Sequence, residues 1–258
     1  MPAEGPAAAG SAAGDAAGFS VARRGPVATL VIDRPAKRNA LTMAMWEALP
    51  EVLAGLDADP GVSVLVLTGA GAHFCAGADI PGLPEDTALF ERVNSTAEAA
   101  LADFAKPTVA MVRGACVGGG CELAVACDLR FAASSARFAI TASRLGLVYP
   151  PGPTRRLVSL VGAAPARYLL YSSLPIGADH AHRIGLVDVV VEDDALEAAV
   201  AEFTDTLAAR SQLSVRAAKA IIGEADPSPE WRSAAAGAEL AEGKRAFTER
   251  REPRFAWR

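Results

Sequence analysis

The chain predicts an α/β fold in which a core of alternating strands and helices is followed by a helical region. Short continuous runs of mostly apolar residues, such as Val62–Thr68, are typical of strands that are covered on both faces. Longer segments with apolar residues at helical spacing lie between these runs. Strands and helices that alternate in this way favour an α/β core, and from about Thr154 onward helical patterns dominate.

Turn and cap residues mark the elements of the core. Residues 25–26, a Gly-Pro pair, separate two strand-like runs. Thr42 is a suitable N-cap for the first helix, and residues 59–61, Asp-Pro-Gly, end it. The expected strands are Phe19–Arg23, Val27–Asp33, Val62–Thr68, Pro107–Val112, Asp128–Ala133 and Phe138–Ile140, and the expected helices are one beginning near Thr42, Thr87–Ala105 and Cys121–Cys127.

The sequence divides into three parts. Residues 1–18 consist mostly of Ala, Gly, Pro and Ser and bury too little apolar surface to fold, so we expect a disordered tail. Residues 19–193 form the expected core, and residues 194–258 form a C-terminal helical region. The later helices are expected at Thr154–Val161, Pro165–Tyr171, Ala178–Ile184, Ala195–Ala209, Ser211–Gly223 and Pro229–Thr248, with Asp188–Val191 as a short strand or extended segment.

Charge and hydrophobicity exclude two classes of partner. The net charge is -5, and no cluster of Lys and Arg stands out, which argues against binding to nucleic acid or to an anionic membrane surface. Although 51% of the residues are hydrophobic, no run approaches the roughly 18–20 apolar residues that a membrane span needs. A local site for an anionic small molecule stays compatible with the negative total.

The four cysteines indicate neither disulfides nor a metal site. Cys75, Cys116, Cys121 and Cys127 lack the paired spacing, with histidines, that zinc ligands show. The beginning of the chain has no basic segment followed by an apolar stretch, so we expect no secretory signal. Free buried thiols in a cytoplasmic protein are the expectation.

Two glycine-rich loops follow buried strands and are the candidate site. The first loop ends in residues 74–80, and the second covers residues 112–122 and contains the triplet of residues 118–120. Successive glycines at a helix start leave backbone N–H groups free and allow a ligand to approach the main chain. Two such amides, one from each loop, can hold one developing oxyanion. The alternative is that these glycines only serve tight turns.

The residues of both loops resemble a known family. Phe74–Ile80 is similar to the F-x-A-G-x-D-[IL] motif of the crotonase superfamily, also called the enoyl-CoA hydratase/isomerase family. Gly114–Asp128 resembles its G-x-x-x-G-G-G-x-E-L-x-x-x-C-D segment, and Ile32–Leu41 and Ala178–Val190 resemble two further segments. The resemblance covers roughly residues 19–258. It implies a crotonase-like spiral of ββα units with a C-terminal helical trimerisation region, and a homotrimer or hexamer.

The resemblance assigns main-chain roles to the loops. The N–H groups of Ala78 and Gly119 take the positions of the two oxyanion donors, with Ala76 and Gly118 beside them. Residues 78–81, among them Asp79 and Ile80, take the position that contacts the adenine end of coenzyme A. Three basic residues are candidates for the phosphates of the coenzyme or for a solvated face: Arg34, Lys37 and Arg38.

Glu122 falls on the position of the first catalytic glutamate of the hydratases. A glutamate in the first turn of a helix also stabilises the helix dipole, which is the alternative role. The second catalytic glutamate is absent: the family's F-x-x-P-E segment ends here in Thr141 and Ala142. Beyond it, Tyr149 has the position at which methylmalonyl-CoA decarboxylases orient the substrate carboxylate, or it is a plain wall residue; those decarboxylases also carry a histidine at the place of Ala78.

Three functions stay open at this point. The first is a hydratase-type lyase that adds or removes water across the α,β bond of an enoyl-CoA with one glutamate in place of two. The second is a decarboxylase of the methylmalonyl-CoA type. The third is a protein that binds coenzyme A thioesters with little turnover. In each case an acyl-CoA is the small-molecule partner, and we expect no metal and no cofactor beyond the coenzyme carried by the substrate.

Overall fold

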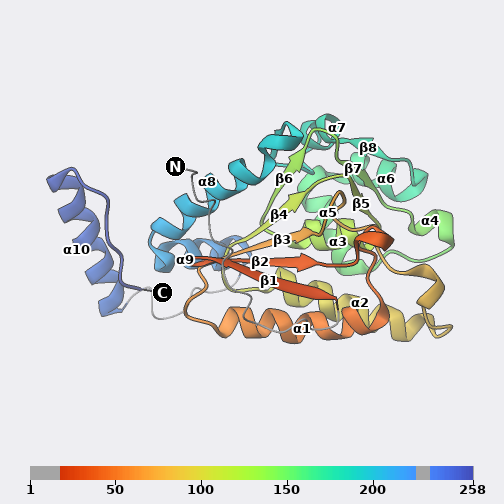
Figure 1. Ribbon diagram of the computed structural model, residues 1–258, viewed down its shortest axis with the longest axis horizontal. Helices are drawn as coiled ribbons and strands as arrows, with labels where there is room; N and C mark the ends of the chain where they lie inside the picture. Colours follow the sequence, from red (N-terminus) through yellow and green to blue (C-terminus); the bar gives the residue numbers. More distant parts are fainter. Residues whose placement is uncertain (1–17, 225–232, 258) are drawn as a thin grey trace, which may run out of the picture.

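Two sheets form the centre of the fold, which is described for residues 18–224 and 233–257 of a computed structural model (Figure 1). The large sheet has the strand order β1-β2-β3-β4-β6-β9, and only β1 runs antiparallel to its neighbour. Its strands are β1 (Phe19–Arg24), β2 (Val27–Ile32), β3 (Val64–Gly69), β4 (Thr108–Val112), β6 (Leu129–Ala133) and β9 (Val189–Val191). The small sheet consists of β5 (Ala115–Val117), β7 (Arg137–Ala139) and β8 (Ile176–Gly177). The expected tail of residues 1–18 lies, except for Gly18, outside the described residues.

The first three strands belong to the large sheet, and from β4 onward the chain passes back and forth between the large sheet and the small one. Helices connect several of the strands, and further helices follow β9. The helices are α1 (Met43–Ala58), α2 (Thr87–Ala102), α3 (Gly119–Ala126), α4 (Ala142–Leu145), α5 (Pro151–Val161), α6 (Ala163–Ser172), α7 (Ala178–Arg183), α8 (Leu196–Ala209), α9 (Gln212–Ile222) and α10 (Ala234–Glu249), with three 3-10 turns, η1 (Pro35–Lys37), η2 (Ile80–Gly82) and η3 (Asp193–Ala195). Isolated β-bridges pair Leu41 with Ala78 and Cys75 with Cys116, and they connect the segments that follow β2, β3 and β4. The α/β class predicted from the sequence is confirmed.

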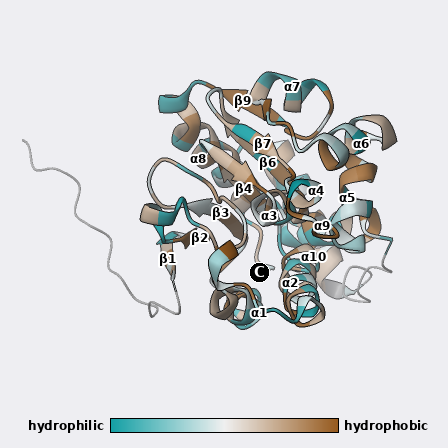
Figure 2. Cartoon of the chain, turned by 90° about the vertical axis from the view of Figure 1, so that its right-hand side faces the viewer, coloured by the Kyte–Doolittle hydropathy of each residue, from teal (hydrophilic) through white to brown (hydrophobic). Residues whose placement is uncertain are grey.

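The central strand of the large sheet, β3, is buried at every position, and its residues Val64–Leu67 are all apolar. In β3, Val64 and Val66 pack with Leu196 of α8 on one side. Leu65 and Leu67 face the main core on the other side. Figure 1 shows α8 above this sheet and α1 and α2 side by side below it. Figure 2 shows hydrophobic colouring along the strands β4 and β9, whereas α7 carries hydrophilic stretches.

Several element boundaries differ from the expectation. Helix α3 begins at Gly119 and not at Cys121, because Gly118, with φ 53° and ψ −117°, already ends the preceding turn. Helix α5 begins at Pro151 and not at Thr154, since proline is well suited to the first helical position. The short elements α4, β5 and β8 were not predicted. The expected helix Pro229–Thr248 starts outside the described residues, and α10 covers Ala234–Glu249.

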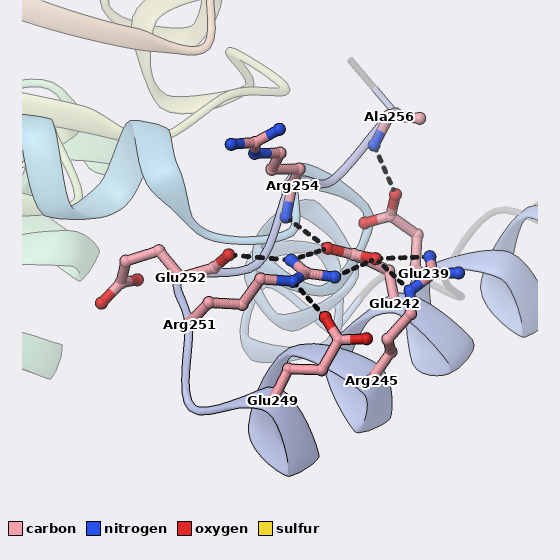
Figure 3. A network of polar contacts seen from close by, with 8 residues as sticks. All are labelled: Glu239, Glu242, Arg245, Glu249, Arg251, Glu252, Arg254 and Ala256. Carbon is pink, nitrogen blue, oxygen red and sulfur yellow. Dashed lines mark hydrogen bonds and ion pairs between the residues drawn. The ribbon is translucent and has the colours of Figure 1, made fainter.

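Helix α10 stands away from the two sheets, and the chain returns along it (Figure 1). Glu242 holds this return: its carboxylate accepts hydrogen bonds from Arg245 (2.5 Å), from Arg251 (2.6 Å) and from the backbone N–H of Arg254 (2.8 Å) (Figure 3). Glu239 accepts one from the backbone N–H of Ala256 (3.0 Å). The helix also carries two large apolar side chains that are exposed, Leu240 (60%) and Phe247 (87%).

The described helices contain no segment that is both long and apolar enough to cross a bilayer. The four cysteines are free and buried, as expected.

Candidate active site

The two glycine-rich loops open onto one cavity of about 250 Å³. Helix α2, the start of α3, and α4 with the segment that follows it complete its walls. The predicted site residues that line it are Ala76, Ala78, Ile80, Gly118, Gly119, Glu122, Thr141, Ala142 and Tyr149. The remaining predicted residues, Arg34, Lys37, Arg38 and Asp79, do not line this cavity.

Two residues of the loops, Ala78 and Gly119, lie close together in the lining of the cavity. The bridge with Leu41 uses the carbonyl of Gly77 and the N–H of Asp79, both at 2.8 Å, and therefore turns the N–H of Ala78 to the other side. A Cβ atom built on Gly119 would lie 3.7 Å from the nitrogen of Ala78, so the two loops are in close contact. Within residues 18–224 and 233–257, neither the Ala78 nor the Gly119 N–H donates a hydrogen bond.

The glycines hold this geometry for steric reasons. Gly118 has a positive φ that side chains rarely adopt. Gly119 lies against the indole of Trp46, which is completely buried, and an added Cβ would come within 2.8 Å of Cζ2 of that ring. The position of the Gly119 amide is therefore set by α1 behind the loop as well as by the loop itself.

Glu122 lies one turn into α3, almost completely buried, with 4% of its surface exposed. Its Oε2 accepts a hydrogen bond of 2.7 Å from Nδ2 of Asn94 on α2. Burial raises the pKa of Glu122 to about 7; the bond from Asn94 opposes this rise and the nearby Glu98 carboxylate adds to it. A carboxyl that takes up and releases a proton near neutral pH is suited to general acid-base work.

The opposite wall is apolar. Ala142, at the start of α4, offers no ionisable group where the second glutamate of the hydratases would stand. Leu145, Leu147 and Val148 follow on the same wall. Burial, together with the negative charge of Glu122, raises the pKa of Tyr149 well above its ordinary value, so its hydroxyl stays a neutral donor near the base.

The basic residues near the N-terminus are divided between two environments. Arg34 forms an ion pair with Asp79 (2.9 Å) and donates to the carbonyl of Ala40, which braces the first loop. Lys37 and Arg38 are exposed, and the carbonyl of Arg38 accepts a hydrogen bond from the N–H of Ala76. The side chains of Lys37 and Arg38 are therefore available beside the loop, whereas Arg34 already has an acidic partner.

Two residues behind Glu122 were missed in the sequence, namely Asn94 and Glu98. Both are buried, with 2% and 1% of their surface exposed, on the face of α2 that also carries Ala97 and Leu101. The signal was present: two polar residues stand at positions where the helical spacing calls for apolar ones. Burial raises the pKa of Glu98 to about 7, although the Arg156 guanidinium at 3.3 Å lowers it.

The two buried glutamates give stability a specific dependence on pH. Between their ordinary pKa of 4.5 and about 7, the folded protein binds more protons than the unfolded chain. The free energy of unfolding is therefore expected to fall as the pH rises from about 5 to about 7, by on the order of 3 kcal/mol for one such group. Urea titrations across this range measure it, and Glu122→Gln should reduce the slope. A slope of opposite sign in this window would contradict the assignment; the lowered pKa of Glu242 acts only at more acid pH.

Comparison with known proteins identifies the family of the chain. The family model for enoyl-CoA hydratase/isomerase matches residues 22–258. The chain is 37% identical to a crotonyl-CoA hydratase of Syntrophomonas wolfei over 203 residues, which is 77% of this chain and 78% of that protein. It is 32% identical to a peroxisomal Delta(3,5)-Delta(2,4)-dienoyl-CoA isomerase of Arabidopsis thaliana, covering 88% of this chain and 91% of that protein.

A solved structure has the same fold. The crystal structure of an enoyl-CoA hydratase/isomerase family protein from Hyphomonas neptunium superimposes with a TM-score of 0.85 at 36% identity, over 93% of this chain and 98% of that one. The chain therefore belongs to the enoyl-CoA hydratase/isomerase family, as its motifs predicted. Within the described residues no group of three His, Cys, Asp or Glu side chains converges as metal ligands.

Proposed function

We propose that the protein catalyses the addition of water across the α,β double bond of an enoyl-CoA, or its reversal, with Glu122 as its one acid-base residue. The observation that carries the proposal is the position of Glu122: a buried carboxyl with a pKa of about 7 lines the same cavity as two free backbone amides. Similarity to crotonyl-CoA hydratase supports the choice of hydration.

The proposed reaction uses the amides for charge and Glu122 for protons. The thioester oxygen accepts hydrogen bonds from the N–H groups of Ala78 and Gly119. Ionised Glu122 takes a proton from water as the water oxygen forms a bond to the β carbon, and the electron pair of the double bond moves onto the thioester to give an enolate. The amides stabilise that negative charge most strongly in the transition state. Glu122 then returns its proton to the α carbon, so atoms and charge balance.

One carboxyl serves both proton transfers in this proposal because Ala142 offers none, and the other carboxyl of the cavity lining, Glu91 on α2, is exposed to solvent. A second positioned acid-base group typically contributes 10²–10⁴-fold. We therefore expect slower turnover than in a hydratase with both glutamates. The apolar residues Leu145, Leu147 and Val148 favour a hydrocarbon acyl chain in this part of the cavity. The exposed Lys37 and Arg38 are the proposed contacts for the phosphates of coenzyme A.

The test is a comparison of two thioesters with mass spectrometric detection. With crotonyl-CoA, the proposal expects a product heavier by one water. Loss of carbon dioxide from methylmalonyl-CoA, with crotonyl-CoA unchanged, would instead identify a decarboxylase that uses the wall at Tyr149. If crotonyl-CoA binds but neither thioester reacts, the protein is a thioester-binding protein for these acyl groups, and hydration of crotonyl-CoA is refuted.

We also propose that α10 mediates assembly of copies of this chain into a trimer, or a hexamer made of two trimers. The helix stands away from the sheets (Figure 1), and Glu239 and Glu242 hold the segment that returns along it (Figure 3). Leu240 and Phe247, seven residues apart and so on one face of the helix, are exposed. Exposed apolar groups of this size, gathered on one helix face, are typical of interfaces.

Replacing Phe247 with glutamate is expected to dissociate the assembly, because the charge would have to be buried between copies. Light scattering coupled to size exclusion measures it: the wild type should have three or six times the mass of one chain, and the variant should have a lower mass. The control is Thr248→Glu, also exposed but roughly 100° around the helix. A monomeric wild type would contradict the proposal.

A further inference from the structure

Two buried oxygen atoms on α2 have no hydrogen-bond partner among the residues that the structure describes: Oδ1 of Asn94 and Oε1 of Glu98. The two residues are four positions apart on one helix, so their side chains lie on the same face, one turn from each other. An amide oxygen and a carboxylate oxygen both accept, and neither satisfies the other. A single proton on the carboxyl turns one of them into a donor and satisfies both.

The other atoms of these groups already have partners, and they indicate which oxygen carries the proton. Oε2 of Glu98 accepts a long hydrogen bond of 3.3 Å from Nη1 of Arg156 on α5; Oε1 lies 3.3 Å from the same nitrogen, in the ion pair, but makes no hydrogen bond with it. Nδ2 of Asn94 donates to Oε2 of Glu122 at 2.7 Å. Among the fully buried side-chain atoms of these residues in the described part of the chain, Oε1 of Glu98 and Oδ1 of Asn94 are the two without a hydrogen bond. An unsatisfied buried acceptor typically costs 1–3 kcal/mol, so an arrangement that removes two of them is favoured.

We propose that Glu98 is protonated on Oε1 in the active protein and donates a hydrogen bond to Oδ1 of Asn94, which holds the Asn94 amide with its NH₂ group toward Glu122. Glu98 is thus a positioning residue, and it acts through Asn94 on the base. The inference rests on the proposed role of Glu122. An amide turned the other way would present its oxygen to the carboxylate and repel its charge.

The charged surroundings of Glu98 are mixed. Arg156 on α5 favours its ionised form, whereas burial and Asp103, at the end of α2, disfavour it. Glu122 on α3 and Tyr149, before α5, lie close enough for their own pKa values to be raised by Glu98. In the described part of the chain, α1 brings no charged side chain that changes the pKa of Glu98. With a pKa of about 7, Glu98 holds its proton on the acid side of neutrality and loses it above.

The proposal is tested first without any substrate. Side-chain carboxyl carbons are labelled in glutamate, and their NMR shifts are followed from about pH 5 to about pH 9. We expect a resonance that titrates near neutrality and is missing in Glu98→Gln but present in the control Glu51→Gln, an exposed glutamate on α1. Arg156→Gln should move its midpoint to higher pH, because a positive charge that favours ionisation is removed. A Glu98 carboxyl that is ionised over the whole range would overturn the proposal, whether or not any thioester is turned over.

The second test uses hydration of crotonyl-CoA. Glu98→Met, which cannot donate, is expected to lower kcat about tenfold with a small change in KM. Glu98→Gln, whose amide donates as the protonated acid does, should restore kcat to within about threefold of the wild type. It should also remove the decline in kcat that the proposal expects of the wild type above neutral pH. Equal losses in the methionine and glutamine variants would refute the positioning role. So would an inactive Arg156→Gln, since an ion pair would then be the required element. If Glu98→Met does not fold, the comparison of wild type with Glu98→Gln still decides.

Discussion

Glu122→Gln is expected to reduce kcat for hydration of crotonyl-CoA by at least 10³-fold, because the same carboxyl accepts the proton of water and delivers a proton to the α carbon. Glutamine keeps the size of the side chain and can still accept the hydrogen bond from Asn94, so the fold should be preserved. Steady-state kinetics of the purified variant measure the effect. KM should change little, since the oxyanion amides that bind the thioester are untouched.

Two comparisons make this result specific. Glu51→Gln removes a carboxylate from an exposed position on α1 and should leave kcat within error of the wild type. Addition of a free carboxylate such as formate to Glu122→Gln gives a further check, since a small external acid-base group can enter the cavity. If Glu122→Gln hydrates crotonyl-CoA at the wild-type rate, the base is another group and the proposed mechanism is wrong.

Gly119→Ala is expected to lower kcat by about 10²–10³-fold through the oxyanion amide. The new Cβ would lie 2.8 Å from Cζ2 of Trp46, a completely buried ring that has little room to move. The backbone of the loop has to shift instead, and the N–H of Gly119 shifts with it. Losing one oxyanion donor costs about 2.7–4 kcal/mol of transition-state stabilisation, which corresponds to the expected loss.

The effect can be separated from general damage to the protein. Gly55→Ala is the control glycine substitution: it lies within α1, its added Cβ would meet no other atom within 4 Å, and it should leave activity unchanged. The double variant Gly119→Ala with Trp46→Leu removes the clash and should recover part of the lost kcat. A Gly119→Ala protein with normal kcat would show that this amide does not hold the developing charge.

Much of the fold was accessible from the sequence because its strands are apolar on both faces and its turns are marked. The run in β3 predicted a doubly covered strand, and Val64–Gly69 is one. Thr42 predicted the start of α1, where its hydroxyl accepts from the N–H of Met45. Such elements are determined by local composition, and long-range contacts do not have to be known in advance.

The remaining elements depend on contacts that a linear reading does not contain. The three residues of β5 count as a strand only because β7 and Cys75 lie beside them. In the site, the motifs placed the loops and Glu122 correctly around one cavity. Asn94 and Glu98 were overlooked since their importance comes from a helix that packs against α3, about 25 residues further along the chain.

The two proposed oxyanion donors are main-chain groups, and this has a consequence for how such a protein changes over evolutionary time. Substituting a side chain does not delete a peptide N–H, so most mutations leave the charge-stabilising half of the site intact. The part of the cavity wall formed by α4 and the residues after it depends on side chains instead. Helix α4 is one short turn, its Leu145 is half exposed, and Val148, which follows it, is largely exposed. Residues there can be exchanged at little cost to folding. One scaffold of this kind can therefore acquire a new reaction through a few changes at Ala142 and Tyr149, while enolate formation is inherited unchanged.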